Sequence, residues 1–263
     1  SIRWHQDGSQ VALLLEAWAL IEASVPAGHS ERIRPLHLLT YAYMSRGKYA
    51  EGLPYARSLL ALLKTERPEQ ADRVQVDRVA WLELAMGTGF AETGEGAKAT
   101  DLAESAVARV RAMHVAGPAQ PELLAVILDV ASHCHLRNKD VKRALVVSTE
   151  AMKILEDPAV ELWGNSQVAI LTGMARVRRA QKKKKESLEL FKRAALTATL
   201  KARDSPREVA YSQVYLYLYL LELGRKAEAE KMKEHVHQLV EEAGFPKGNR
   251  IRERLRDGKF EGY

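Results

Sequence analysis

The densest concentration of charge in the sequence is a run of seven cations without an anion at residues 176–185. Such a run could bind an acidic peptide, a phosphorylated segment or nucleic acid. It could equally lie in solvent at the end of a helix, where cations complement the partial negative charge of the carboxyl terminus. Arg176 and Arg179 are about one helical turn apart and are expected to share a face. The candidate anion-binding residues are Arg176, Arg178, Arg179, Lys182, Lys183, Lys184 and Lys185.

A second concentration is aromatic and lies in YSQVYLYLYLLELG, residues 211–224. Tyr211, Tyr215 and Tyr219 are spaced four residues apart, so a helix stacks them on one face. Packing in the core with the hydroxyl groups at its edge is the simpler interpretation. The alternative is an aromatic floor that holds a side chain of a ligand.

Histidine and cysteine do not occur in metal-binding patterns. Residues two apart on a helix point about 200° apart, so His133 and His135 cannot converge on one ion, and neither can His235 and His237. The sequence also has no G-x-S-x-G motif, no P-loop and no glycine-rich dinucleotide fingerprint after a strand. We therefore predict no metal, no cofactor and no catalytic residue.

Five short polar turns organise the chain. They read RGKYAEG at 46–52, TGEGAKA at 93–99, NKDVKRA at 138–144, QKKKKES at 181–187 and LGRKAEA at 223–229. Each ends on a small residue, and these residues recur at intervals of 47, 45, 43 and 42. Counting back twelve gives Thr40, Gly87, Ser132 and Ala175, again small, with Tyr217 as the exception. Small residues at fixed places let two helices approach closely, which predicts a repeated helix–turn–helix unit.

The predicted map has an N-terminal cap at 1–29 with one helix, helix pairs at 30–64, 68–114, 119–156, 158–202 and 205–243, and a basic tail at 244–263 with one short helix. Ser205-Pro206 and Asp157-Pro158 each predict a helix start, the first with a capping box to Glu208. Pro54 predicts a kink or a late start. No segment alternates with period two, so we expect an all-α chain that forms one continuous solenoid.

The helix–turn–helix unit, with small residues at its eighth and twentieth positions, resembles the tetratricopeptide repeat. Gly47-Lys48-Tyr49 at the entry to a second helix and Met86-Gly87 in a first helix support this resemblance, which covers about residues 30–243. The units are longer than the usual repeat of about 34 residues. In that respect they are similar to kinesin light chains and to some bacterial transcriptional activators. The resemblance implies a right-handed α–α superhelix of about five helix pairs with an extra N-terminal helix.

The resemblance also implies a concave face lined by the first helix of each pair. The family's clamp for a C-terminal carboxylate needs lysine, asparagine and arginine there, and this sequence lacks them, so that clamp is not expected. Aromatic residues and arginine contribute much of the energy of protein interfaces. The residues expected to bind a partner are His37, Tyr41, Trp81, Thr88, Asp129, His133, Arg176, Arg179 and Tyr211, within a wider set that adds Arg34, Leu84, Thr172 and Leu218.

Composition agrees with a folded binding module. The chain is 46% hydrophobic and 28% charged, which excludes a disordered protein. One cysteine, Cys134, excludes a disulfide scaffold, and no window of 18 uncharged apolar residues predicts membrane insertion. The net charge of +6 is concentrated in residues 176–185 and in the tail from Gly244. We expect a reducing compartment, either the cytoplasm or the nucleus.

The leading hypothesis is a non-enzymatic protein–protein interaction scaffold. It would bind a peptide or helical segment of a partner on the concave face, and an acidic segment is a candidate because of Arg176 and Arg179. One alternative is binding of nucleic acid or another polyanion through residues 176–185 and the basic tail. Another is a ligand-sensing regulatory domain of a larger activator.

Overall fold

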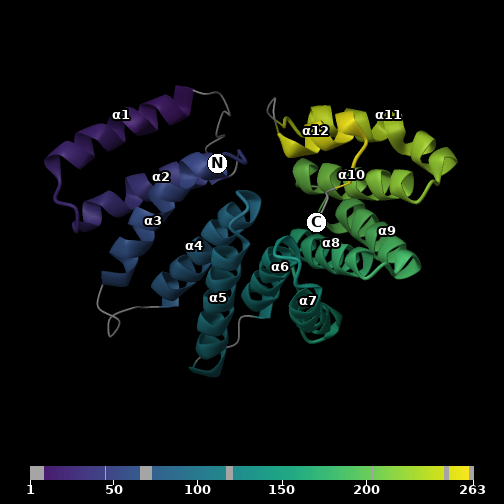
Figure 1. Cartoon of the computed structure of the whole chain (residues 1–263), viewed down its shortest axis with the longest axis horizontal. Helices are drawn as coiled ribbons and strands as arrows, with labels where there is room; N and C mark the ends of the chain where they lie inside the picture. The colour runs from purple at the N-terminus through teal and green to yellow at the C-terminus, as the bar shows by residue number, and fades with distance from the viewer. Residues whose placement is uncertain are drawn as a thin grey trace. The chain divides into compact units, whose positions relative to one another are not determined.

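The computed structural model describes residues 9–44, 46–65, 73–116, 121–202, 204–245 and 249–260. These residues form helices and no strand, which confirms the predicted all-α fold. The chain divides into two compact units, residues 1–113 and 114–263 (Figure 1). Each unit is built from helix pairs.

The first unit begins with an extra helix that packs on the first pair. Trp18 is buried and lies edge-to-face against Tyr55, with the ring centroids 6.4 Å apart. Arg32 donates hydrogen bonds to the carbonyl oxygens of Glu22 and Val25, each at 2.9 Å, and so fixes the end of this helix. The elements of this unit are α1 (Ser9–Ser24), a 3-10 turn (Ser30–Arg32), α2 (Ile33–Met44), α3 (Tyr49–Thr65), α4 (Arg73–Glu92) and most of α5 (Gly96–Ala116).

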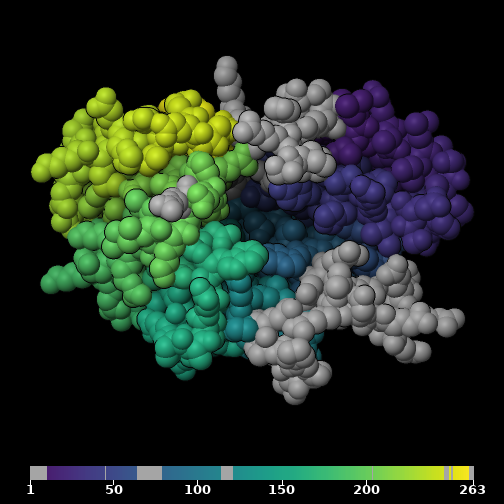
Figure 2. All heavy atoms as spheres, turned by 180° about the vertical axis from the view of Figure 1, so that it is seen from behind, coloured from purple at the N-terminus to yellow at the C-terminus, as the bar shows by residue number. Residues whose placement is uncertain are grey.

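The second unit contains three helix pairs and a short final helix. Its elements are α6 (Pro121–Arg137), α7 (Val141–Glu156), α8 (Gly164–Ala180), α9 (Lys184–Lys201), α10 (Pro206–Glu222), α11 (Lys226–Glu242) and α12 (Arg250–Asp257). The first helices pack in order, α6 on α8 and α8 on α10, and each second helix packs on its own first helix. The short helix α12 contacts α10 and α11, and the whole unit is a continuously packed body, teal to yellow in Figure 2.

Each helix pair is joined by the same turn. The residue five positions before the small residue that ends each turn has a positive φ in every pair: Gly47, Gly94, Lys139, Lys182 and Gly224. The following residue donates its N–H to a carbonyl five residues earlier, as from Lys48 to Tyr43 at 3.0 Å, which is the Schellman arrangement. Glycine adopts this conformation freely, whereas lysine costs about 1 kcal/mol there. The common geometry confirms the repeat register read from the sequence.

The small residue that ends each turn lies where the two helices of a pair approach. A Cβ added to Gly52 would lie only 3.0 Å from the Cβ of Tyr43. In the fourth pair, the hydroxyl of Ser187 donates a hydrogen bond to the carbonyl of Ala175 at 2.9 Å. All five of these residues, Gly52, Ala99, Ala144, Ser187 and Ala229, are buried. The predicted close packing within pairs is therefore confirmed.

The prediction that Asp157-Pro158 starts a helix is wrong. Asp157 is the C-cap of α7, and its carboxylate accepts a hydrogen bond from the backbone N–H of Ala159 at 2.9 Å. This local side-chain bond holds the backbone in a turn, so α8 begins only at Gly164.

Two other predictions of helix ends are corrected in part. Ser205 is the N-cap of α10 and Pro206 its first residue, as predicted. The Ser205 side chain makes no capping hydrogen bond, however, so the predicted capping box with Glu208 is absent. The late start of the second helix near Pro54 is also wrong, because α3 begins at Tyr49 and continues through this proline.

Candidate functional site

Three of the residues predicted to bind a partner line one cavity in the first unit. His37 and Tyr41 of α2 and Trp81 of α4 surround a space of about 550 Å³. Tyr41 is 63% exposed and Trp81 46% exposed, which is unusual for side chains of this size in a packed helical unit. The remaining lining residues are Ile33, Arg34, Thr40, Met44, Leu59, Leu63, Leu82 and Ala85.

A polar atom without a partner lies in the wall of this cavity. The hydroxyl of Thr40 is buried and has no hydrogen-bond partner among the described residues. At the same place in the third pair, Ser132 is satisfied, because its hydroxyl bonds to that of Ser148 at 2.6 Å. The residue of the first pair that corresponds to Ser148 is Ala56, which has no hydroxyl. A buried hydroxyl left without a bond costs about 1–3 kcal/mol, so a ligand atom that bonds Thr40 would gain affinity.

The other two residues predicted on α4 lie outside this cavity. Thr88 is partly buried but is not among the lining residues. Leu84 is 1% exposed and belongs to the core. The cavity therefore involves only the amino-terminal part of the face predicted for α4.

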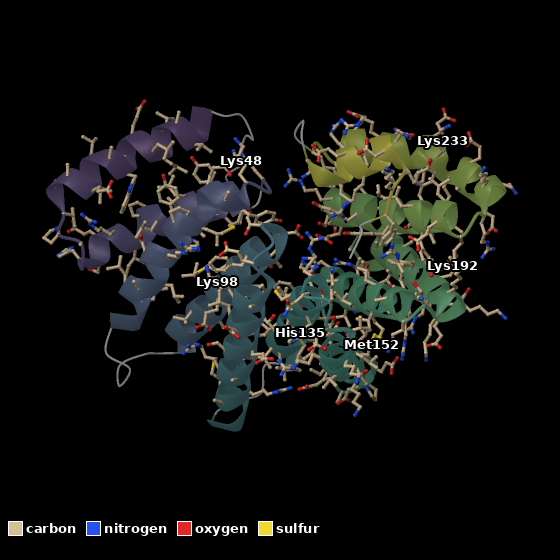
Figure 3. All side chains as sticks on the ribbon, in the orientation of Figure 1. Lys48, Lys98, His135, Met152, Lys192 and Lys233 are labelled. Carbon is tan, nitrogen blue, oxygen red and sulfur yellow. The ribbon has the colours of Figure 1, made fainter. Side chains whose placement is uncertain are left out.

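In the second unit, polar side chains from four helices meet. We call Asp129 and His133 of α6, Arg176 of α8, Tyr215 of α10 and Arg254 of α12 the arginine cluster. The guanidinium of Arg176 lies 2.7 Å from Nδ1 of His133, and that of Arg254 donates to the Tyr215 hydroxyl at 2.8 Å. Both guanidinium groups lie over the Tyr215 ring, at 6.0 and 5.7 Å from its centroid. Figure 3 shows side-chain nitrogen atoms gathered where α6, α8 and α10 meet.

The cluster perturbs the acids and bases within it. Burial lowers the pKa of His133 well below its usual value, and the guanidinium groups of Arg176, Arg137 and Arg254 lower it further. A guanidinium can only donate, so Nδ1 of this neutral imidazole accepts from Arg176. Burial alone would raise the pKa of Tyr215, but Arg176 and Arg254 reverse that effect and lower it.

Asp129 is the acid of the cluster. Burial raises the pKa of its carboxyl group to about 7, although Arg176 opposes the shift. Its Oδ1 packs directly against Gly173, where an added Cβ would lie 1.8 Å from this oxygen. The glycine therefore gives the carboxyl group the room to lie between α6 and α8.

We expect Asp129→Asn to stabilise the protein in a pH-dependent way. A carboxyl group whose pKa is higher in the folded state than its model value of 3.8 destabilises the fold as it ionises, so the penalty is absent in acid and complete above about pH 7. The variant should gain up to about 4 kcal/mol in the free energy of unfolding at about pH 8 and less than about 1 kcal/mol at about pH 4. Urea unfolding at both pH values measures this gain. An equal effect at both would show that Asp129 is not an ionisable group with a raised pKa.

The tyrosine stripe of α10 is covered by the chain's own C-terminal residues. Tyr215 and Tyr219 pack against Phe191 and Phe260, with centroids 5.0–6.3 Å apart. Tyr211 lies edge-to-face against Phe245 at 5.0 Å. Tyr219 is buried in the core, as the simpler interpretation predicts, whereas Tyr211 and Tyr215 are partly buried and pack against the core.

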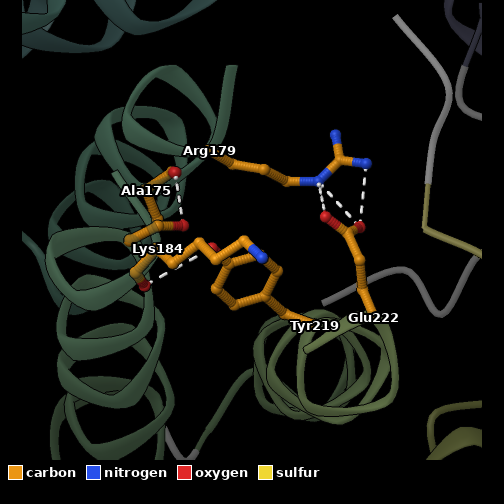
Figure 4. Close-up of polar contacts among 6 residues, drawn as sticks. Ala175, Arg179, Lys184, Tyr219 and Glu222 are labelled. Atoms are coloured by element: carbon orange, nitrogen blue, oxygen red, sulfur yellow. Dashed lines mark hydrogen bonds and ion pairs between the residues drawn. The ribbon is translucent and has the colours of Figure 1, made fainter. Parts of the chain in front are cut away.

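The seven cations of residues 176–185 do not form one surface. Arg178 pairs with Glu186 at 3.1 Å. Arg179 pairs with Glu222 at 2.9 Å (Figure 4). Its guanidinium carbon lies 4.4 Å from the centroid of the Phe260 ring. Lys182, Lys183, Lys184 and Lys185 are exposed at the turn between α8 and α9. Of the predicted anion-binding set, only Arg176 belongs to the arginine cluster.

The histidine–cysteine segment of α6 offers no metal site. Among the described residues, no group of three or more histidine, cysteine or acidic side chains could hold a metal ion. Burial raises the pKa of the Cys134 thiol to about 12, so this sulfur stays protonated at neutral pH and is a poor nucleophile.

Three residues of these two sites were missed from the sequence. The repeat register identifies Thr40 only as a small residue, and Ser132 in the same register also carries a hydroxyl. The tyrosine spacing leaves Tyr215 open between core packing and a ligand-binding aromatic surface. Arg254 lies in a basic tail, and nothing local to NRIRERLRD shows which helix it contacts.

The described part of the chain contains no helix that is both long enough and apolar enough to cross a membrane.

No family model and no curated protein matches the sequence. Solved structures do match. One holds the nearly identical TPR-like repeats of a protein described as a kinesin light chain from Podosopora anserina, at 18% identity and a TM-score of 0.55, covering 83% of this chain and 99% of that one. Another is a Rap protein complexed with Competence and Sporulation Factor, at 16% identity and a TM-score of 0.60, covering 95% of this chain and 71% of that one. A third is aspartyl phosphate phosphatase F from Bacillus subtilis, at 13% identity and a TM-score of 0.59, covering 96% of this chain and 67% of that one.

These similarities extend over most of each chain, while the identities are low enough that they establish the fold alone. The helix pairs, their common turns and the small residues within them agree with the resemblance seen in the sequence. The chain has the all-α helical-repeat fold seen in these TPR-like structures.

Proposed function

We propose that this protein is an interaction module that binds a segment of another protein in the cavity of its first unit. The occupant we infer is a bulky apolar side chain of that segment that also carries, or lies beside, a hydrogen-bonding group. The observation that supports this proposal is the cavity itself, with exposed aromatic rings at His37, Tyr41 and Trp81 and an unsatisfied buried hydroxyl at Thr40.

The physical reasons are the usual ones for a protein interface. Aromatic side chains bury a large area at a small entropic cost, and they are frequent among the residues that dominate binding energy. The cavity combines such rings with apolar walls from Leu59, Leu63 and Leu82. A solved protein of the same fold is named in complex with Competence and Sporulation Factor, which is consistent with a fold that presents a binding surface.

Peptides selected on the intact chain from a random displayed library provide the test. We expect Trp81→Ala to weaken binding of the selected peptides by about 30-fold, because removing an interface anchor costs about 2 kcal/mol or more. Tyr41→Ala should have a similar effect. Isothermal titration calorimetry measures both affinities.

Trp163 supplies the matched control. It is 72% exposed, but it lies in the second unit and does not line this cavity. Trp163→Ala should bind the same peptides with the wild-type affinity. Equal affinity of the Trp81→Ala and Trp163→Ala chains, both shown to be folded by circular dichroism, would contradict the proposal.

We also propose that the module acts by binding rather than by catalysis. Asp129, His133 and Tyr215, whose pKa values are shifted, belong to the arginine cluster, where guanidinium groups occupy the positions next to His133 and Tyr215. The phosphatase name of one similar structure describes that protein. Binding of a polyanion through residues 176–185 is less favoured, because Arg178 and Arg179 are engaged by carboxylates of the chain itself.

A further inference from the structure

The ring of Phe260, which follows the last helix, lies in a box formed by side chains of three other helices. We call Phe191 of α9, Tyr215 and Tyr219 of α10 and Arg179 of α8 the aromatic box. The centroid of the Phe260 ring lies 5.5 Å from those of Phe191 and Tyr215 and 5.9 Å from that of Tyr219. The guanidinium carbon of Arg179 lies 4.4 Å from the same centroid. The box therefore surrounds a ring that belongs to no helix.

The walls of the box are fixed by contacts with one another and with the helices. The Phe191 ring packs on those of Tyr215 and Tyr219, with the centroids 6.3 and 5.0 Å apart. The guanidinium of Arg179 is fixed by Glu222, whose two carboxylate oxygens accept from Nε at 3.0 and 2.9 Å (Figure 4). These contacts do not involve the enclosed ring, so the box keeps its form when that ring leaves. Such preorganisation lowers the entropic cost of binding.

Phe260 is held in the box through its side chain. Among the residues that the structure describes, none forms a backbone hydrogen bond with Lys259 or Phe260. The preceding helix α12 is anchored independently, because Ile251 and Leu255 are buried in the core of the second unit. The box therefore recognises a ring rather than a backbone conformation. A ring presented by another chain can make the same contacts.

The charge of Arg179 determines the kind of side chain that the box prefers. A guanidinium is attracted to the negative face of an aromatic ring. An aliphatic side chain of equal volume gains the same burial but not this attraction. Phe260 is partly exposed, so the box opens to solvent. These properties describe an accessible site that favours aromatic over aliphatic side chains.

From this arrangement we infer that the aromatic box binds an aromatic side chain of a partner segment, and that Phe260 is an internal occupant which this side chain replaces. Only Gly258 and Lys259 separate Phe260 from α12, so its ring competes at an effective concentration in the millimolar range. The tail thus weakens binding of any other ring. That a partner protein supplies the ring rests on the proposed function, whereas the box itself stands on the contacts of Phe260.

The test titrates the intact Phe260→Ala chain with the acetylated and amidated peptide RDGKF, which is the chain's own sequence at 256–260. The readout is the ¹H–¹⁵N signal of the Arg179 Nε–H group, which an aromatic ring facing the guanidinium shifts upfield. We expect a saturable upfield shift with a dissociation constant of about 1–10 mM. The wild-type chain should bind the same peptide about tenfold more weakly, because its own ring occupies the box.

Two matched comparisons separate the box from general apolar binding. A peptide with cyclohexylalanine in place of its phenylalanine keeps the size of the side chain but has no aromatic ring. In competition with RDGKF it should bind the Phe260→Ala chain about threefold or more weakly. The second comparison is the Lys259→Ala chain, which should bind RDGKF as weakly as the wild type, because the Lys259 side chain is exposed and the Phe260 ring is kept.

Several results would overturn the inference: no saturable shift in the folded Phe260→Ala chain, equal affinity of the wild-type and Phe260→Ala chains for RDGKF, or equal affinity of the two peptides. Unfolding of Phe260→Ala would also overturn it, because Phe260 would then be part of the core and not a replaceable occupant.

The Trp81→Ala chain separates this inference from the proposed function, because Trp81 lies in the first unit. If Trp81→Ala still binds the selected peptides while Phe260→Ala binds RDGKF, the aromatic box stands and the cavity proposal fails. If Trp81→Ala loses the selected peptides and Phe260→Ala does not bind RDGKF, the cavity proposal stands and the aromatic box fails.

Discussion

Arg109→Met is expected to lower the free energy of unfolding by about 3–5 kcal/mol, because it removes the guanidinium group that pairs with a buried carboxylate. Glu83 is 0% exposed, and its carboxylate accepts from Nε and Nη2 of Arg109 at 3.3 and 3.2 Å and from the Ser105 hydroxyl at 3.1 Å. Methionine keeps much of the length of arginine but none of its charge. Urea denaturation followed by circular dichroism measures the loss.

The double variant Glu83→Leu with Arg109→Met is the control. Glu83 occupies a place in the repeat where Leu36, Leu128 and Leu171 are buried, so leucine fits the packing of this position. Replacing both charges by apolar groups is often neutral, whereas removing one is not. We expect the double variant to lie within about 1–2 kcal/mol of the wild type. A single Arg109→Met variant as stable as the wild type would show that the ion pair contributes nothing.

Phe191→Ala is also expected to lower the free energy of unfolding by about 3–5 kcal/mol. The Phe191 ring is 0% exposed and lies among Tyr215, Tyr219 and Phe260. Its removal leaves a cavity beneath the ring on which the arginine cluster is built. The same urea denaturation measures this loss.

Leu196 on the same helix is the matched control for Phe191. It is 60% exposed, so Leu196→Ala should change the free energy of unfolding by less than about 0.5 kcal/mol. Similar losses in the two variants would mean that the aromatic group around Phe191 is not a packed core.

The architecture was readable from the sequence because it depends on local and periodic signals. Small residues at fixed places and polar turns are repeated five times, and each copy confirms the others. Even Lys139 and Lys182, which are poor residues for a positive φ, hold the turn geometry, because packing of the repeat overrides local preference. Asp157 shows the limit of such signals. The same aspartate can cap a helix or close a turn, and the sequence alone does not decide between them.

The residues that line the cavity of the first unit could be predicted in part from the sequence. His37, Tyr41 and Trp81 could be placed on one face because they lie on first helices at fixed steps. The role of Thr40 could not be predicted, because its hydroxyl lacks a partner only since Ala56, on the second helix of the same pair, has no hydroxyl group. Arg254 could not either, since its contact with Tyr215 spans 39 residues and depends on how α12 packs on α10. Such long-range contacts depend on how the helices pack in the folded unit, and the sequence contains no periodic pattern that predicts them.

The cavity of the first unit is tested most directly by the ¹H–¹⁵N signal of the Trp81 indole during titration with a selected peptide. Trp163 in the same molecule serves as the internal reference, because its ring is exposed outside the cavity. We predict that the Trp81 indole signal shifts and saturates with the peptide while the Trp163 signal stays in place. An unmoved Trp81 signal at saturating peptide would contradict the cavity as the binding site.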